Sequence, residues 1–167
     1  LGRREEALEA YDGALGKDPR SAEGHLRRGL LLLSLSRTDE AMGAIERSIE
    51  VDETHPRAWS EKGAILAGTG RHGEAVEAFG RALGIEPGNP VTLRRRGASL
   101  LALGKIPDAI ADLETATGMA PEDAGGWLDL GTAQIRGGFF DTAAASLGRS
   151  LALDPGNPRA WCASGLA

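Results

Sequence analysis

The feature that most constrains this chain is a spacing of 34 residues, which recurs from one end of the sequence to the other. Glycine, alanine and proline each follow it, with Glu53 standing where one proline would fall. The three sets are Gly29, Gly63, Gly97, Gly131 and Gly165; Ala7, Ala41, Ala75, Ala109 and Ala143; and Pro19, Pro87, Pro121 and Pro155. A fixed period of this length predicts a stacked array of equal units, each packed mainly on its neighbours.

Each unit has the pattern of two helices joined by a short turn. In residues 56–89, "PRAWSEKGAILAGTGRHGEAVEAFGRALGIEPGN", apolar residues fall at helical spacing on both sides of Gly70. Gly70 can adopt the left-handed conformation that ends a helix, and Pro87 stops the second helix. The first helices are preceded by residues that suit an N-cap, with His55 as the exception. These N-cap residues are Ser21, Asn89, Asp123 and Asn157. We expect an all-α protein of about nine helices with no strand.

The pattern Trp, Gly, Ala, Phe, Ala, Pro at a 34-residue period, complete in residues 56–89, resembles the tetratricopeptide repeat. The resemblance covers the whole chain and implies an α-solenoid, a right-handed superhelix whose first helices line a concave groove. Several positions depart from the family pattern. Tryptophan is replaced by His25 and Leu93, leucine by Arg28, Lys62 and Arg96, a large apolar residue by Gln134, and proline by Glu53.

The 34-residue period continues through the whole chain, so we expect a single repeat array, 1–167, and no second domain. We expect a half repeat at 1–21, full repeats at 22–55, 56–89, 90–123 and 124–157, and a half repeat at 158–167. The chain does not begin with methionine, and we expect it to be a piece of a longer protein. Its two half repeats complement one another, which predicts head-to-tail self-association with Trp161 of one copy near Tyr11 of the next.

Composition narrows the classes of partner. The net charge of −5 argues against nucleic acid, which needs a concentrated basic face. No apolar stretch approaches the roughly 20 residues that span a bilayer, so we expect no membrane contact. The single cysteine, Cys162, excludes an internal disulfide and favours a reducing, cytoplasmic location.

The sequence offers no chemistry for an enzyme. "GTGRHG" at 68–73 matches a dinucleotide fingerprint in letters, but a helix precedes it where the fingerprint needs a strand. The three histidines and Cys162 are not spaced as metal ligands. No nucleophile has a base beside it in the register. We expect no catalytic residue, no cofactor and no metal.

Three consecutive arginines, Arg94, Arg95 and Arg96, fan out around a first helix and cannot form one patch. Arg95 belongs to a set with alternating charge at the 34-residue spacing, so we expect it to point towards Glu61 or Asp129. The stem of Arg96 should pack while its head reaches water. Arg94 is the member expected to contact a partner.

The resemblance and the register together predict the groove. Its expected residues are Leu26, Leu30, Leu33, Arg57, Ser60, Ala64, Ala67, Arg94, Ala98, Leu101, Leu128, Thr132 and Ile135. Such a surface suits an apolar segment that carries a carboxylate. We interpret the chain as a protein-interaction scaffold that binds a peptide or a protein segment. The alternative is the substrate-recruiting arm of a larger enzyme such as a transferase or kinase. The family's clamp for acidic chaperone tails needs groove asparagines, and the only two here, Asn89 and Asn157, fall in turns.

Overall fold

The computed structural model describes residues 2–165, and within them the chain forms ten helices and no strand. The helices are α1 (Gly2–Lys17), α2 (Ala22–Ser34), α3 (Thr38–Val51), α4 (Pro56–Gly68), α5 (His72–Ile85), α6 (Pro90–Ala102), α7 (Ile106–Met119), α8 (Ala124–Gly137), α9 (Phe140–Leu153) and α10 (Pro158–Ser164). The expectation of an all-α fold is confirmed. Residues 1 and 166–167, at the outer ends of the two expected half repeats, lie outside the described part of the chain.

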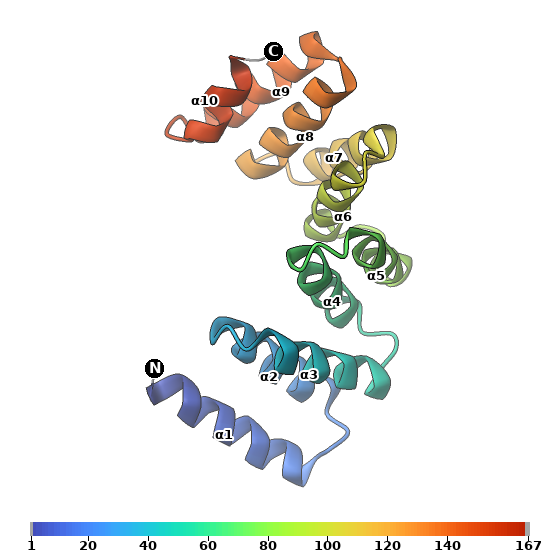
Figure 1. The fold of residues 1–167 in the computed structure, drawn as a ribbon, viewed down its shortest axis with the longest axis vertical. Helices are drawn as coiled ribbons and strands as arrows, with labels where there is room; N and C mark the ends of the chain where they lie inside the picture. Colours follow the sequence, from blue (N-terminus) through green and yellow to red (C-terminus); the bar gives the residue numbers. More distant parts are fainter. Residues whose placement is uncertain (1, 166–167) are drawn as a thin grey trace.

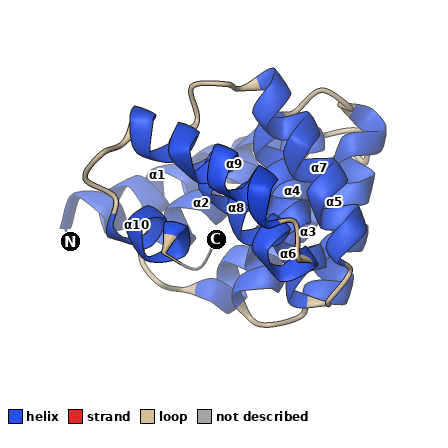
Figure 2. Cartoon of the chain, turned by 90° about the horizontal axis from the view of Figure 1, so that it is seen from above, coloured by secondary structure: helices blue, strands red, loops and turns tan. Residues whose placement is uncertain are grey.

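The helices pack in pairs, and the pairs stack into a solenoid. The most extensive contacts join α2 to α3, α4 to α5, α6 to α7 and α8 to α9. Each second helix then packs on the first helix of the following pair, as α3 does on α4 and α5 on α6. Figure 1 shows the stack curving into a crescent with the two termini at its opposite ends. Seen from above, it consists of helices and short loops only (Figure 2).

The periodic glycines lie where the two helices of a pair cross. A Cβ atom added to Gly63 would lie 2.6 Å from the ring of Phe79, which is fully buried. The equivalent distances are 2.7 Å from Gly29 to Ile45, 2.8 Å from Gly97 to Leu113 and 2.7 Å from Gly131 to Leu147. These contacts are closer than any side chain tolerates, so each full pair depends on a residue without a Cβ.

The turn between paired helices requires a left-handed residue in every unit. Gly70, Gly104 and Gly138 have φ angles of +79°, +74° and +80°. Ser36 occupies the same place in the α2–α3 turn and adopts φ +60° although it carries a side chain. The turn geometry therefore prevails over the local preference of serine, which disfavours this region.

The expected N-caps are confirmed. The side chains of Ser21, Asn89, Asp123 and Asn157 accept hydrogen bonds from the first backbone N–H groups of α2, α6, α8 and α10. His55, at the start of α4, makes no side-chain cap.

The residue that replaces a family tryptophan in α2 performs the same structural task. Trp59 Nε1 donates a hydrogen bond of 2.9 Å to the carbonyl oxygen of Glu53, six residues earlier. His25 Nε2 likewise contacts the carbonyl oxygen of Pro19 at 3.0 Å, also six residues earlier. The same bond recurs at Trp127 and Trp161, so α2, α4, α8 and α10 are tied to the loops that precede them, whereas Leu93 offers no such donor in α6.

The basic residues that replace leucine are all paired with carboxylates. Arg28 and Lys62 reach back to the preceding second helix and contact its carboxylates, at 2.6 Å and 2.8 Å. At Arg96 the corresponding residue of α5 is Gly80, which has no carboxylate to offer. Arg96 turns instead to Asp112 in its own pair, with two hydrogen bonds of 2.6 Å and 2.7 Å. The Arg96 side chain nevertheless remains 28% exposed, similar to Arg28 at 25%, so this ion pair is not cut off from solvent.

A candidate peptide-binding groove

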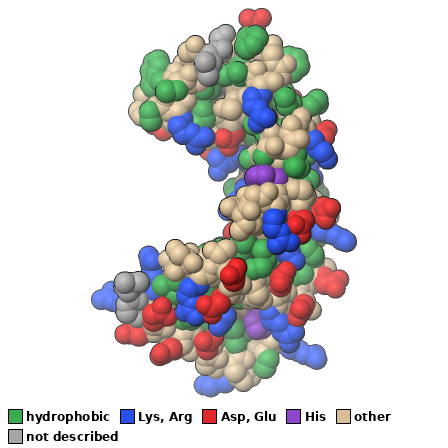
Figure 3. All heavy atoms as spheres, in the orientation of Figure 1, with side chains coloured by type: hydrophobic (Ala, Val, Ile, Leu, Met, Phe, Trp, Pro, Cys, Tyr) green, Lys and Arg blue, Asp and Glu red, His purple; other side chains and the backbone are tan. Residues whose placement is uncertain are grey.

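The first helices form the inner face of the crescent. Consecutive first helices contact one another directly, as α4 does α6, α6 does α8 and α8 does α10. In the part of the chain that is described, consecutive second helices make no comparable contact. Helices that approach one another more closely lie on the inside of a curved stack, so the first helices form its concave side. Figure 3 shows the hollow between the two ends of the stack.

Ten of the residues expected in the groove are at least partly exposed to solvent. Arg57 and Ala98 are exposed. The others are half-buried: Leu30, Leu33, Ala64, Ala67, Arg94, Leu101, Thr132 and Ile135. They come from the first helices α2, α4, α6 and α8, because residues at intervals of three and four share one face of a helix. The surface they form is apolar and made largely of small or aliphatic side chains.

Three of the expected groove residues do not reach the surface. Leu26, Ser60 and Leu128 are 0%, 6% and 5% exposed. All three occupy the same position in their repeats, on the side where consecutive first helices meet. Ser60 shows the contact directly, since its hydroxyl lies 3.0 Å from that of Thr92 across the seam between α4 and α6. Because they are buried, these three residues cannot contact a partner directly.

Arg94 holds the position equivalent to Leu26, Ser60 and Leu128, but it is too long for the seam. Its guanidinium lies over the start of α8, where Gly125 leaves room: a Cβ there would lie 2.7 Å from Nη1 of Arg94. Arg94 contacts Asp123 at 3.4 Å and Asp129 at 3.5 Å. Its side chain stays 35% exposed, with much of its charge already balanced by two carboxylates.

Arg95 follows the expectation from the alternating charges. Its Nη1 contacts the carboxylate of Glu61 at 3.1 Å, across the seam between α4 and α6. Asp129, the other partner considered for Arg95, pairs with Arg94 instead. Burial raises the pKa of Asp129, and the neighbouring arginines oppose that rise only partly.

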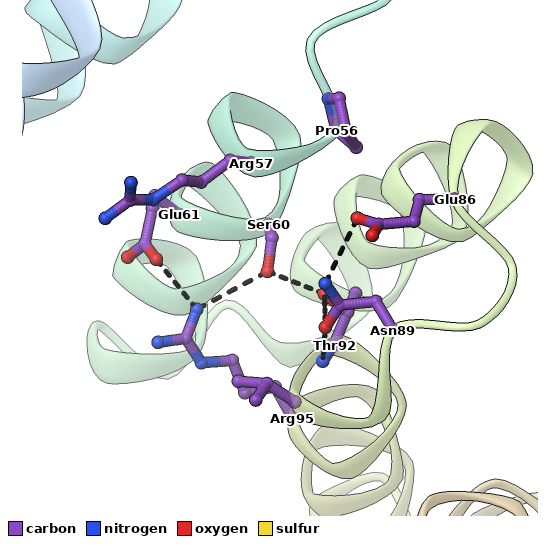
Figure 4. Close-up of a pocket in the computed structure, with 9 residues that line it drawn as sticks. Pro56, Arg57, Ser60, Glu61, Glu86, Asn89, Thr92 and Arg95 are labelled. Carbon is purple, nitrogen blue, oxygen red and sulfur yellow. Dashed lines mark hydrogen bonds and ion pairs between the residues drawn. The ribbon is translucent and has the colours of Figure 1, made fainter. Parts of the chain in front are cut away.

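A polar cleft of about 250 Å³ opens between the beginnings of α4 and α6. Its walls are Pro56, Arg57, Ser60, Glu61, Glu86, Asn89, Val91, Thr92 and Arg95. Figure 4 shows Arg95 reaching across to Glu61 and Ser60, while Arg57 projects away from these contacts. Sequence reasoning missed this cleft as a unit because it combines residues from two repeats and the loop between them.

An apolar cleft of about 300 Å³ opens between the ends of α2 and α4. Leu33, Ala64 and Ile65 form its apolar walls, and Thr38, Gly68 and Thr69 its rim. The register had assigned Leu33 and Ala64 to the groove. Gly68, whose absent side chain leaves the cleft open, belongs to the same face of α4 at the next helical turn.

No three His, Cys, Asp or Glu side chains among residues 2–165 are grouped so that they could hold a metal ion. Cys162 is exposed, and no helix in this part of the chain is both long and apolar enough to cross a membrane.

Comparison with known families decides the identity of the repeat. The family described as Tetratricopeptide repeat matches residues 1–53, 43–90, 94–158 and 128–167. The chain belongs to the tetratricopeptide repeat family. Among curated proteins, none matches the sequence itself.

Several solved structures superpose on most of the chain, among them YrrB, which is described as a tetratricopeptide repeat protein. YrrB matches with a TM-score of 0.85 at 21% identity, covering 95% of this chain and 82% of YrrB. MamA from Desulfovibrio magneticus RS-1 matches with a TM-score of 0.83 at 19% identity, covering 94% and 89%. The Cut9–Hcn1 structure matches with a TM-score of 0.87 at 19% identity, covering 98% of this chain and 33% of the other. At these identities the likeness shows the fold, and the solenoid expected from the sequence is confirmed.

Proposed function

We propose that this chain is a protein-interaction scaffold that binds a peptide or a segment of a partner protein in its concave groove. The observation that carries the proposal is the set of half-exposed apolar side chains on the first helices α2, α4, α6 and α8, of which α4 contacts α6 and α6 contacts α8 along the inner side of the stack. Apolar surface of this extent, with a charged cleft at its edge, is typical of a site that a partner covers.

Two of the related structures support this direction. YrrB is described as a tetratricopeptide repeat protein with an unusual peptide-binding site. Cut9 and Hcn1 form a hetero-tetramer. The groove of this chain differs from the acidic-tail clamp considered above, because Asn89 and Asn157 serve as N-caps and do not line the groove as that clamp requires.

The arginines of the inner face fit a protein partner better than a nucleic acid. Arg94 and Arg95 are each engaged by carboxylates of neighbouring helices, so they do not form an open track for phosphates. If the chain bound RNA, it would retain RNA in a filter-binding assay, and this retention would weaken as salt is added. Our proposal predicts no retention at any salt concentration.

The same groove would serve the alternative, a recruiting arm joined to a catalytic domain. The two proposals differ only in what is attached to the array, so the complete open reading frame separates them. In either case we place the array in the cytoplasm, on the argument from its single cysteine.

The proposal is tested by selecting binders from a displayed library of random peptides. Ala98→Glu puts a charge into the middle of the groove, and Ala111→Glu puts the same charge on an exposed site of α7. We expect the selected peptides to lose binding to Ala98→Glu and to keep it with Ala111→Glu. Equal binding to both variants, or no selected peptide at all, would contradict a groove-binding function.

A further inference from the structure

The apolar cleft between the ends of α2 and α4 is continuous with the candidate groove, because Leu33 and Ala64 belong to both. Its floor is part of the hydrophobic core. Ile65 is 6% exposed and belongs to the core cluster against which Leu33 packs. Side chains held by close core packing keep their places in the absence of a partner. The cleft is therefore a preformed hollow of about 300 Å³.

Small residues on the rim keep this cleft open. Thr38 and Gly68 both stand there, and nothing lies within 4 Å of a Cβ atom placed on Gly68. The 34-residue register gives the residues that stand at the same places in the following units, so the three junctions between first helices can be compared directly.

Between α4 and α6, larger side chains stand at the equivalent places. His72 replaces Thr38 and Leu103 replaces Thr69, each 34 residues further along the chain. His72 is half-buried, and its Nδ1 atom is buried. Its imidazole is thus packed at the place where threonine leaves space in the preceding unit.

Between α6 and α8, side chains occupy the equivalent space. Gly137 is the counterpart of Thr69, and a Cβ atom placed on it would lie 2.8 Å from the ring of Phe139 and 3.2 Å from Cγ2 of Ile106. Arg136 stands at the place of the rim glycine and brings a charge to it. Of the three junctions, α2–α4 is therefore the one whose rim residues leave room for an apolar group.

The chemistry of the cleft suits one large apolar side chain. Leu33, Ala64 and Ile65 present hydrocarbon to it, and no charged residue is among its walls. Thr69 Oγ1 donates to the backbone carbonyls of Ile65 and Leu66, so its hydroxyl is satisfied within α4. The volume lies at the lower end of the range of ligand pockets, roughly 300–1,000 Å³, which is room for a side chain but not for a folded segment. An apolar side chain gains by burial there, whereas a charged one would lose its hydration without finding a partner.

Building on the proposed function, we propose that the apolar cleft between α2 and α4 is a specificity subsite of the groove. It receives one leucine, methionine or phenylalanine side chain of the bound segment, which we call the anchor residue. The apolar surface of Ala67, Ala98 and Leu101 continues along the groove and contacts the rest of the segment without a comparable hollow. The anchor residue therefore fixes the register in which the segment lies across the first helices.

The test uses peptides selected from the displayed library on the parent chain that lose binding to Ala98→Glu, so that each of them binds in the groove. The affinity of each peptide, and of a copy with its anchor residue replaced by alanine, is measured on the parent chain and on three variants. Gly68→Leu fills the cleft, and Gly68→Ala fills part of it. Gly84→Leu is the matched control on the exposed surface of α5, and at both glycines nothing lies within 4 Å of the added Cβ.

We expect the selected peptides to share one large apolar residue, and its replacement by alanine to weaken binding to the parent chain about tenfold or more. Gly68→Leu should weaken binding of the intact peptides to a similar extent and Gly68→Ala to a smaller one, while Gly84→Leu should leave it unchanged. The alanine-substituted peptides should bind Gly68→Leu and the parent chain equally, because neither complex then uses the cleft.

Groove-dependent peptides that share no large apolar residue, or that bind Gly68→Leu as well as the parent chain, would overturn this inference and leave the scaffold function standing. A library that yields no peptide sensitive to Ala98→Glu would overturn both.

Discussion

The close helix crossing at Gly63 allows the packing of the array to be tested by a single methyl group. Gly63→Ala would place a Cβ atom 2.6–3.0 Å from three ring carbons of Phe79. Phe79 is 0% exposed and lies among buried neighbours, so its ring cannot withdraw without moving them. Overpacking of a filled core costs about 1–3 kcal/mol.

Alanine also has a higher helix propensity than glycine, worth about 1 kcal/mol in a helix interior. The matched control is Gly80→Ala in α5, where nothing lies within 4 Å of the added Cβ. Because both substitutions gain the same propensity, it cancels when they are compared. Gly63→Ala should therefore be less stable than Gly80→Ala by about 1–3 kcal/mol, and Gly80→Ala should be slightly more stable than the parent chain.

The measurement is chemical denaturation followed by far-ultraviolet circular dichroism, with the transition slopes compared between variants. Repeat arrays can unfold in more than one step, so hydrogen exchange in α4 and α5 should accompany it. If Gly63→Ala proves as stable as Gly80→Ala, with unchanged slopes, the crossing is looser than its distances imply and the packing argument is refuted.

Three further predictions concern charge and the exposed end of the stack. Arg96→Ala should cost about 1–2 kcal/mol because it leaves Asp112, only 8% exposed, without its partner, whereas Arg94→Ala should cost no more than about 0.5 kcal/mol; thermal or chemical melts that rank them oppositely would contradict this. Burial raises the pKa of Asp129, so its carboxyl group binds a proton more tightly in the folded chain than in the unfolded chain. The folded chain therefore loses stability as the pH rises from the carboxyl pKa of the unfolded chain to that of the folded chain. Asp129→Asn should consequently gain stability relative to the parent as the pH rises above the ordinary aspartate pKa of about 3.9, and a difference independent of pH would argue against it. Trp161 is 59% exposed on α10, and we expect the isolated chain to associate at high concentration through it; sedimentation velocity showing a monomer throughout, unaffected by Trp161→Glu, would exclude this.

The departures from the repeat pattern could be located from the sequence, but their consequences could not. Gln134 is buried and accepts a hydrogen bond of 2.8 Å from Ser146, a residue twelve positions away on the facing helix. Arg96 finds Asp112 in a similar way. The sequence of one helix shows only that a polar residue stands where the family has an apolar one. The compensating residue becomes visible when the crossing of the two helices brings the two positions together.

For the groove, too, the sequence predicted part of the arrangement and the structure decided the rest. Periodicity identified which face of each first helix turns inwards, because residues three and four apart share a face regardless of what the helix packs against. It did not identify the depth of each residue on that face. Ser60 is covered by the next first helix, α6, whose Thr92 hydroxyl lies 3.0 Å from its own, and Leu26 and Leu128 at the equivalent positions are also buried.

The sequence by itself determined the architecture of this protein. Its 34-residue period, small residues at the crossings and caps at the helix starts are local features, and local features suffice when each unit packs only on its neighbours. The tertiary structure alone decided which charges remain available to a partner. Arg57, Arg94 and Arg95 look alike in the sequence, yet carboxylates of neighbouring helices pair with Arg94 and Arg95, while no ion pair forms at Arg57 within residues 2–165. That difference depends on distances of a few ångströms between residues about 30 positions apart, which are set only when the helices stack.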